Sequence, residues 1–191
     1  MASVTQICNR ALQKLGAKAI TSIDENSNAA RACLNCYEDI RDAELMDHRW
    51  AFAIKRVQIA ADSPEPEWGR ANSFTLPVDY LKVIAPYPEN DTFDRDWVVE
   101  NGKILTNESA PLYLRYIAKI SDPAQMDALF REALSTKMAL EMCETITQSN
   151  TKKESLRADY DDIVKRARKA SAIQSVPIVP VEDEWIAVRN N

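Results

Sequence analysis

The residues with the clearest capacity for chemistry are four cysteines and a single histidine in a chain of 191 residues. Cys33 and Cys36 form a CxxC motif, the spacing used for half of a zinc site or for a redox pair. The chain has no second CxxC, and His48 lies twelve residues beyond Cys36. Apolar residues around the motif recur at helical spacing, so we expect both thiols to pack as small hydrophobic groups on a helix. The sequence therefore predicts neither a metal site nor a cofactor.

Catalysis by paired side chains is the second kind of chemistry to consider. A cysteine nucleophile needs a base and an orienting group, and no such arrangement is recognisable around the four cysteines. Two neighbouring carboxylates could share acid–base work, as in Asp39 with Asp42 or Asp161 with Asp162. These carboxylates fall opposite the apolar stripes of predicted helices, where solvated charge is expected. We therefore expect no catalytic residues and a protein that is not an enzyme.

A basic run, KRARK, ends the last predicted helix and contains Lys165, Arg166, Arg168 and Lys169. Contact with nucleic-acid phosphate is one role for such a run, and an acidic rim on a protein partner would suit it equally. Cations are also favoured at a helix C-terminus, where free carbonyls carry partial negative charge. The formal charge of the whole chain is −5, which argues against tight wrapping of DNA. A small DNA-binding protein that uses this basic end remains the alternative function.

The stretch HRWAFAIKR, residues 48–56, connects the second predicted helix to a segment with strand-like spacing. Trp50 and Phe52 are aromatic side chains of a kind that buries on the order of 150–250 Å² each. A histidine at a helix C-terminus is stabilised there by the helix dipole. We expect His48, Trp50 and Phe52 to form a structural elbow that locks the long helix onto the β segment.

Hydrophobic spacing divides the rest of the chain into helices and a β insertion. Helices are expected over residues 3–16, 24–48, 123–148 and 151–172. The β insertion covers residues 51–120, and its strongest signal is Asn101-Gly102, which accepts the positive φ of a tight hairpin turn. The predicted fold is mainly α with a β insertion (α+β): an antiparallel bundle of about four helices, with a small antiparallel β region between the second and third. Residues 1–172 are expected to form one domain, since about 100–200 residues per domain is usual.

Two capping boxes set the predicted starts of helices. Ser22 is followed three residues later by Glu25, and Thr151 is followed by Glu154. In this pattern each side chain satisfies a backbone N–H that has no partner inside the helix. A third start is expected at Pro123, because proline is favoured in the first turn.

Residues 173–191 differ from the rest because they have two prolines three positions apart and no helical stripe. We expect an extended C-terminal arm. Simple disorder is the default for a terminus, but the segment is more apolar than chains that stay in water, and an extended peptide with an aromatic anchor suits docking on a partner. The expected partner-binding residues are Pro177, Ile178, Val179, Pro180, Val181, Trp185, Ile186 and Val188.

The amino terminus lacks the apolar core of a signal peptide, and no apolar run is long enough for a bilayer. We therefore expect reduced thiols in a cytosol and no membrane contact.

Several strings then follow one another in a distinctive order. They are ICNRALQKLGAKAITSIDE, YEDIRDAELMDHRWAFAIKRVQIA, EWGRANSFTLPVDYLKV, PLYLRYIAKI, ALSTKMALEMCETITQS and DYDDIVKRARKA. With the order of elements, this set resembles the head-to-tail adaptor family of tailed bacteriophages, which includes the tail tubular protein A type of short-tailed phages. The resemblance covers nearly the whole chain, and it is carried by the ordered set rather than by any single string.

The resemblance implies a structural virion protein without catalytic residues. Family members form wedge-shaped subunits that assemble as a homo-oligomeric ring, usually of twelve, below the portal protein. The ring extends the channel through which DNA passes during packaging and ejection, without sequence-specific binding, and provides a platform for the tail nozzle or tail tube. The protein would then reside at the head–tail interface of the virion, and in the host cytoplasm during assembly.

The resemblance also implies roles for individual residues. Pro177 to Val188 would bind the portal. The fold-defining positions around the elbow would be Trp50, Phe52, Trp68, Pro77 and Tyr80.

Overall fold

The computed structural model describes residues 2–87 and 97–174. The predicted partner-binding residues of the arm, Pro177 to Val188, lie outside the described residues. Four α-helices and two small antiparallel sheets give the α+β fold that the sequence predicts. The elements in chain order are α1 (Val4–Leu15), α2 (Asn28–Asp47), the 3-10 helix η1 (Ala51–Ala53), β1 (Ile54–Ile59), β2 (Asn72–Thr75), β3 (Tyr80–Tyr87), β4 (Trp97–Glu100), β5 (Lys103–Thr106), β6 (Leu112–Ala118), the 3-10 helix η2 (Pro123–Gln125), α3 (Ala128–Thr147) and α4 (Asn150–Ile173).

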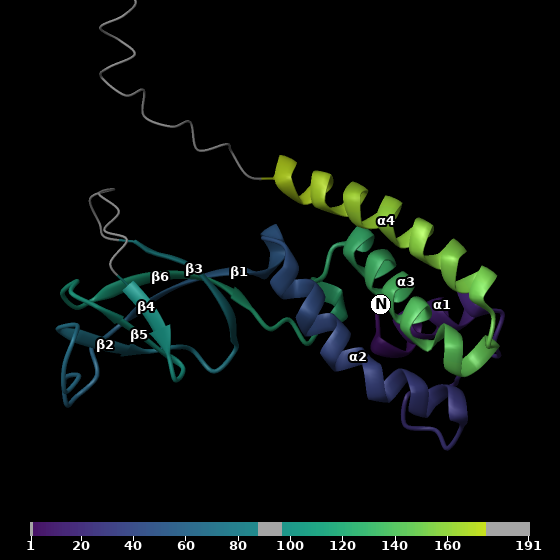
Figure 1. Cartoon of the computed structure of the whole chain (residues 1–191), viewed down its shortest axis with the longest axis horizontal. Helices are drawn as coiled ribbons and strands as arrows, with labels where there is room; N and C mark the ends of the chain where they lie inside the picture. Colours follow the sequence, from purple (N-terminus) through teal and green to yellow (C-terminus); the bar gives the residue numbers. More distant parts are fainter. Residues whose placement is uncertain (1, 88–96, 175–191) are drawn as a thin grey trace, which may run out of the picture.

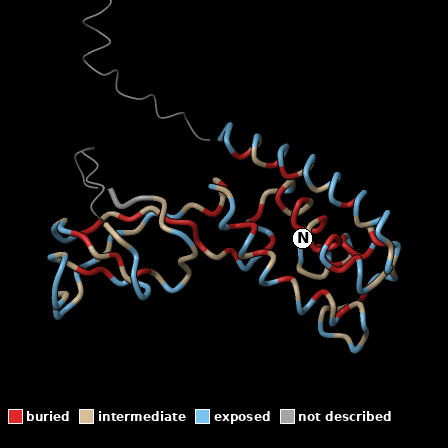
Figure 2. Tube along the Cα trace, in the orientation of Figure 1, coloured by how far each residue is buried: buried red, intermediate tan, exposed pale blue. Residues whose placement is uncertain are grey.

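The helices and the strands occupy different halves of the molecule, as Figure 1 shows. We call these the helical half and the β half. Buried residues run through the inside of both halves (Figure 2), and one continuous core includes Leu12 and Phe130 of the helices as well as Ile104 and Leu114 of the strands. The two halves therefore share their hydrophobic packing at the junction.

The first helix matches its prediction, whereas the second begins later than expected. Ser3 and Gln6 form a capping box at the start of α1, and Gly16 ends it with a left-handed φ of 75°. The predicted start of α2 at residue 24 is wrong, because the helix begins at Asn28 with Ser27 as its cap. The Glu25 carboxylate instead accepts a hydrogen bond from the Thr21 backbone N–H at 2.7 Å, which closes a local turn.

The starts of the last two helices are also shifted. Pro123 begins the short η2, and α3 starts only at Ala128. The predicted cap at Thr151 is wrong, since Ser149 accepts from the Lys152 N–H and α4 begins at Asn150. The connection between α3 and α4 is short, as an antiparallel helix pair requires.

The strands form two three-stranded sheets, with the orders β1-β6-β3 and β2-β5-β4. The predicted hairpin is confirmed: β4 and β5 pair across Asn101 (φ 46°) and Gly102 (φ 72°). Alternation along β6 buries Leu112, Leu114 and Tyr116 on the inner face of its sheet. The residues between them therefore lie on the outer face, because successive strand side chains point to opposite sides.

Candidate functional site

The junction of the two halves is built around Trp50, whose side chain is only 1% exposed. Its ring packs edge-on against His48 and Phe130, with centroid distances of 4.8 Å and 4.9 Å. Phe52 packs edge-on against Phe130 at 5.1 Å. The structure thus brings the three predicted elbow residues together and adds Phe130 of α3, which sequence reasoning did not include. We call this group of four rings the joint.

A hydrogen bond ties the joint to the end of α2. The indole Nε1–H of Trp50 donates to the backbone carbonyl of Glu44 at 2.8 Å. This carbonyl belongs to the last turn of α2, where backbone acceptors have no partner inside the helix. Trp50 therefore supplies both packing and a missing donor.

The role expected for His48 needs correction. His48 does follow the last helical residue of α2, as predicted. Burial and the nearby Arg168 guanidinium lower the pKa of its imidazole, however, so the neutral form is favoured. A neutral ring gains little from the helix dipole, and its edge-on packing against Trp50 is the interaction that the structure supports.

A buried carboxylate connects α2 with α4. The Tyr160 hydroxyl donates to the Glu44 carboxylate, at 2.7 Å and 2.8 Å from its two oxygens. Burial raises the pKa of Glu44, because removal from water disfavours its charged form. Burial and the bond to Glu44 also raise the pKa of Tyr160. Spacing along the chain gives no sign of this contact, because Glu44 and Tyr160 are 116 residues apart.

The last turn of α4 is attached to the joint by two polar contacts. The Ala51 backbone N–H donates to Ser171 Oγ at 2.9 Å. The Arg168 guanidinium forms an ion pair with the Asp47 carboxylate. Both contacts connect α4 to the chain on either side of Trp50, so the C-terminal end of α4 has a fixed place beside the joint (Figure 1).

The four predicted basic residues of α4 do not act as one group. Lys165, Arg166 and Lys169 are exposed, whereas Arg168 is half-buried. Arg166 lies 3.8 Å from the Asp162 carboxylate, and Arg168 pairs with Asp47. Two of the four charges therefore have carboxylate partners within the protein, which weakens the prediction of a concentrated positive end.

The CxxC thiols pack as the sequence predicts, in contact with a third thiol. Cys33 is fully buried and Cys36 is half-buried on α2. The neighbouring Cys33 thiol, together with burial, raises the pKa of the Cys8 thiol of α1. Burial, with the neighbouring Cys33, raises the pKa of Cys36 to about 12. All four cysteines are free, and the residues within 2–87 and 97–174 contain no cluster of three or more metal-ligating side chains.

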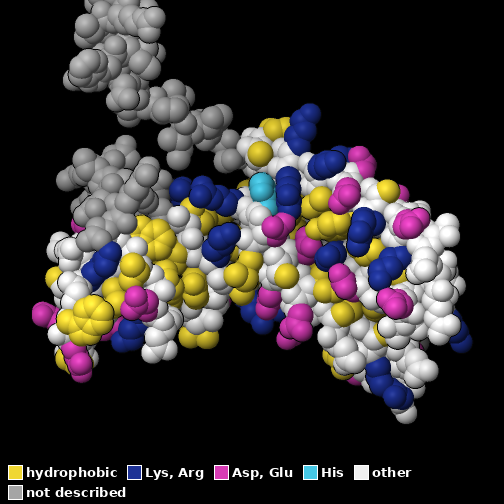
Figure 3. Space-filling view, viewed as in Figure 1, with side chains coloured by type: hydrophobic (Ala, Val, Ile, Leu, Met, Phe, Trp, Pro, Cys, Tyr) yellow, Lys and Arg dark blue, Asp and Glu magenta, His cyan; other side chains and the backbone are white. Residues whose placement is uncertain are grey.

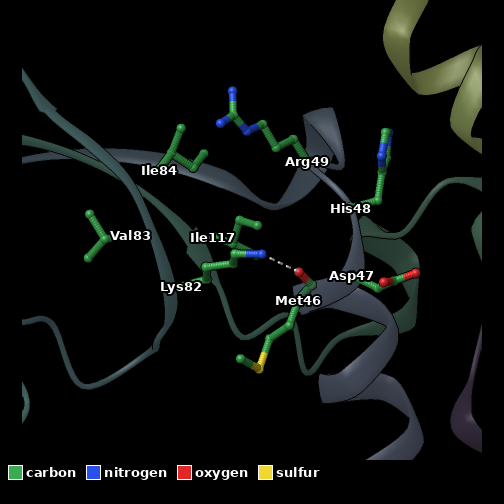
Figure 4. Close-up of a pocket in the computed structure, with 8 residues that line it drawn as sticks. All are labelled: Met46, Asp47, His48, Arg49, Lys82, Val83, Ile84 and Ile117. Atoms are coloured by element: carbon green, nitrogen blue, oxygen red, sulfur yellow. Dashed lines mark hydrogen bonds between the residues drawn. The ribbon is translucent and has the colours of Figure 1, made fainter. Parts of the chain in front are cut away.

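A hollow of about 300 Å³ lies between the end of α2 and the outer face of the β1-β6-β3 sheet. Figure 4 shows Lys82 reaching from β3 to the Met46 carbonyl, a hydrogen bond of 3.2 Å. In the same view Arg49 extends from the connection after α2 across to Ile84. The lining also includes Asp47, so the hollow has charges of both signs beside apolar side chains such as Ile84 and Ile117.

One residue that the resemblance assigned to the elbow lies elsewhere. Trp68 is 86% exposed, on the loop between β1 and β2. Its side chain is not part of the core, whereas Tyr80 does pack against the core. A fold-defining role for Trp68 is therefore wrong.

No protein-family model matches the chain, and no curated protein gives a significant match. The described helices include none that combines the length and the apolar character needed to cross a bilayer.

Proposed function

We propose that this protein is a structural head-to-tail adaptor of a tailed, short-tailed bacteriophage. Its subunits would form a ring, with twelve as the expected number, between the portal protein and the tail nozzle or tail tube. The ring would extend the DNA channel without catalysing a reaction. The proposal rests on the resemblance of the ordered strings and on the geometry of the joint.

The attachment of α4 to the joint is the observation that supports the proposal most directly. Ser171 and Arg168 fix the last turn of α4 beside Trp50. The chain that continues after Gln174 therefore starts from the place where the helical and β halves meet. An adaptor needs such a defined origin, since a segment that docks on a neighbour must leave every subunit of a ring at the same position.

The joint supports the same function through rigidity. Trp50, Phe52 and Phe130 fill the junction with interlocking rings, and the Glu44–Tyr160 bond adds a buried polar contact between α2 and α4. Close-packed interiors transmit displacement instead of absorbing it. A subunit of this kind keeps its two ends in a constant relation while one binds the portal and the other binds the tail.

The proposal is tested by mixing the purified chain with the portal protein encoded in the same genome. Ring-shaped particles on the portal, seen by negative-stain electron microscopy, are the expected result. A chain truncated after Gln174 keeps Ser171 and its bond to Ala51. This variant should melt at the same temperature as the full chain and lose portal binding.

Two results would contradict the proposal in different ways. A full chain that never associates with the portal would exclude the adaptor function. A truncated chain that binds the portal as well as the full chain does would leave the adaptor function standing, but would remove residues 175–191 from the interface.

A further inference from the structure

The outer face of the β1-β6-β3 sheet carries a row of basic side chains that leads to the joint. Arg56 of β1 and Arg115 of β6 are direct partners in the antiparallel register. Lys82 of β3 is the register partner of Ile117. Ile117 lies two residues beyond Arg115 on β6 and therefore on the same face of the sheet. Arg49, between His48 and Trp50 of the joint, points toward Ile84 of β3 in Figure 4, and both residues line the hollow. We call these four residues the basic seam.

The register of the strands makes the seam electrostatically unusual. Directly opposed residues of an antiparallel pair have Cβ atoms about 4.5–5.5 Å apart, and like charges there destabilise the sheet. The Arg56–Arg115 pair has this arrangement in a protein whose formal charge is −5. Two positively charged side chains therefore start from directly opposed positions on one face of the sheet.

Among the described residues, the carboxylates that border the seam have other partners. Asp47 pairs with Arg168, and Asp79 pairs with Lys55 on the opposite face of the sheet. Arg49 and Arg56 are exposed and form no ion pair with any carboxylate in the described part of the chain. Their charges are therefore available to an external anion.

The surface view agrees with this placement. In Figure 3, Lys and Arg side chains gather beside the histidine, over the junction of the two halves. Arg168 lies beside this surface as well, but Asp47 pairs with its charge, so the basic residues left without an ion pair within residues 2–87 and 97–174, Arg49 and Arg56, are at the sheet end of the junction. A row of cations along an extended surface matches a backbone of repeated phosphates better than it matches a single small anion.

We propose that the basic seam contacts the phosphate backbone of duplex DNA. The inference rests on the proposed function, because it identifies the face of the subunit that would be turned toward the channel. Contacts to phosphate alone carry no sequence information and allow a protein to slide along DNA. The seam would thus guide DNA past the subunit without stopping it.

The test is the binding of a 30-base-pair duplex to the full chain, measured by fluorescence anisotropy between about 25 and 200 mM salt. The seam variant R49Q/R56Q/K82Q removes three positive charges from exposed positions. Each phosphate contact contributes about 0.9 to the slope of log K against log salt, so loss of three contacts should reduce the slope by about 2.7. Affinity at the lowest salt should fall by at least about tenfold.

A control variant, K18Q/K152Q/R157Q, removes the same charge from exposed positions away from the seam. It should bind DNA nearly as the parent chain does, and both variants should keep the parent melting temperature. The double variant R49Q/R56Q keeps the Lys82–Met46 bond. It should still lose about 1.8 of the slope, which separates loss of contacts from local unfolding.

Four outcomes would overturn the inference. They are no binding by the parent chain at low salt, equal losses in the seam and control variants, a seam variant with an unchanged slope, and displacement of DNA by poly-glutamate at equal charge. The last would mark the seam as a surface for an acidic protein. Portal association by the seam variant is measured separately: if it is intact while DNA binding is lost, both proposals stand, and if the parent chain binds DNA but never the portal, only the adaptor function fails.

Discussion

Replacement of Trp50 by alanine tests whether the joint holds the two halves together. The side chain is 1% exposed, contacts three other rings, and donates one hydrogen bond to the Glu44 carbonyl. The substitution removes all of these interactions at once and leaves a cavity between α2, α3 and η1. The expected consequence is a large loss of stability, with no catalytic step involved.

The size of the loss in stability follows from the usual cost of truncating a buried aromatic side chain. Truncation of a buried Phe or Trp to Ala costs about 3–5 kcal/mol. This range already includes the cost of leaving a partner group without its hydrogen bond. The Glu44 carbonyl therefore places the expected loss toward the upper end of the range. A domain with a free energy of unfolding of about 5–15 kcal/mol would lose a large part of its stability. For a chain of this size the melting temperature should fall by about 6–20 °C.

The assay is urea unfolding followed by far-ultraviolet circular dichroism, with a thermal melt of the same samples. The variant should shift the midpoint while the slope m stays constant, because the surface exposed on unfolding is nearly unchanged. Trp50→Phe keeps a ring but removes the N–H, so the Glu44 carbonyl loses its donor. That variant should lose only about 1–3 kcal/mol.

Trp68→Ala is the matched control, since it deletes the same side chain from an 86% exposed position. It should change the free energy of unfolding by less than about 0.5 kcal/mol. A structural role for Trp50 at the junction is refuted if the free energy of unfolding of Trp50→Ala lies within about 1 kcal/mol of the parent value, or if Trp68→Ala is equally destabilised.

Three further substitutions or treatments probe other parts of the molecule. Burial raises the pKa of Glu44, so its contribution to stability is fully present below its unfolded pKa and is lost as pH rises through the folded value. Glu44→Gln still offers Tyr160 an acceptor, and its side chain does not ionise. Its free energy of unfolding, measured by urea titration, should therefore rise relative to that of the parent chain as the pH is raised from about 4 to about 7. A difference in free energy that does not change with pH would contradict this. Cys8 and Cys33 are fully buried, so a thiol reagent should label them only after unfolding, as mass spectrometry of labelled peptides can show. Gly102→Ala places a side chain at a φ of 72° in the β4–β5 turn, and should cost about 1–2 kcal/mol in the same urea assay.

The sequence predicts elements that depend on local contacts. The period of apolar residues was sufficient for α1, and Asn101-Gly102 was sufficient for the β4–β5 hairpin. The start of α2 was wrong because Ser22 and Glu25 satisfy the same pattern when they close a turn. Local hydrogen bonding of this kind competes with the helix, and the sequence alone does not show which one prevails.

The candidate site was predictable only in part, because most of its contacts join distant positions. The grouping of His48, Trp50 and Phe52 followed from their closeness in the chain. The bond between Ser171 and Ala51 spans 120 residues, and the Arg56–Arg115 pair depends on the register of β1 and β6. Spacing within one segment contains no information about such partners. The division of the strands into two sheets was missed for the same reason.

The contact between Ser171 and Ala51 also determines how a mechanical load would enter the subunit. Tension applied at Gln174 meets this bond and the Arg168–Asp47 ion pair within the last turn of α4. The pull is then divided between the helix axis and the short η1, which continues directly into β1. Peeling of α4 away from α3 would have to begin by breaking both contacts. A force on the C-terminal end of α4 is thereby transmitted to the sheet as well as to the helices.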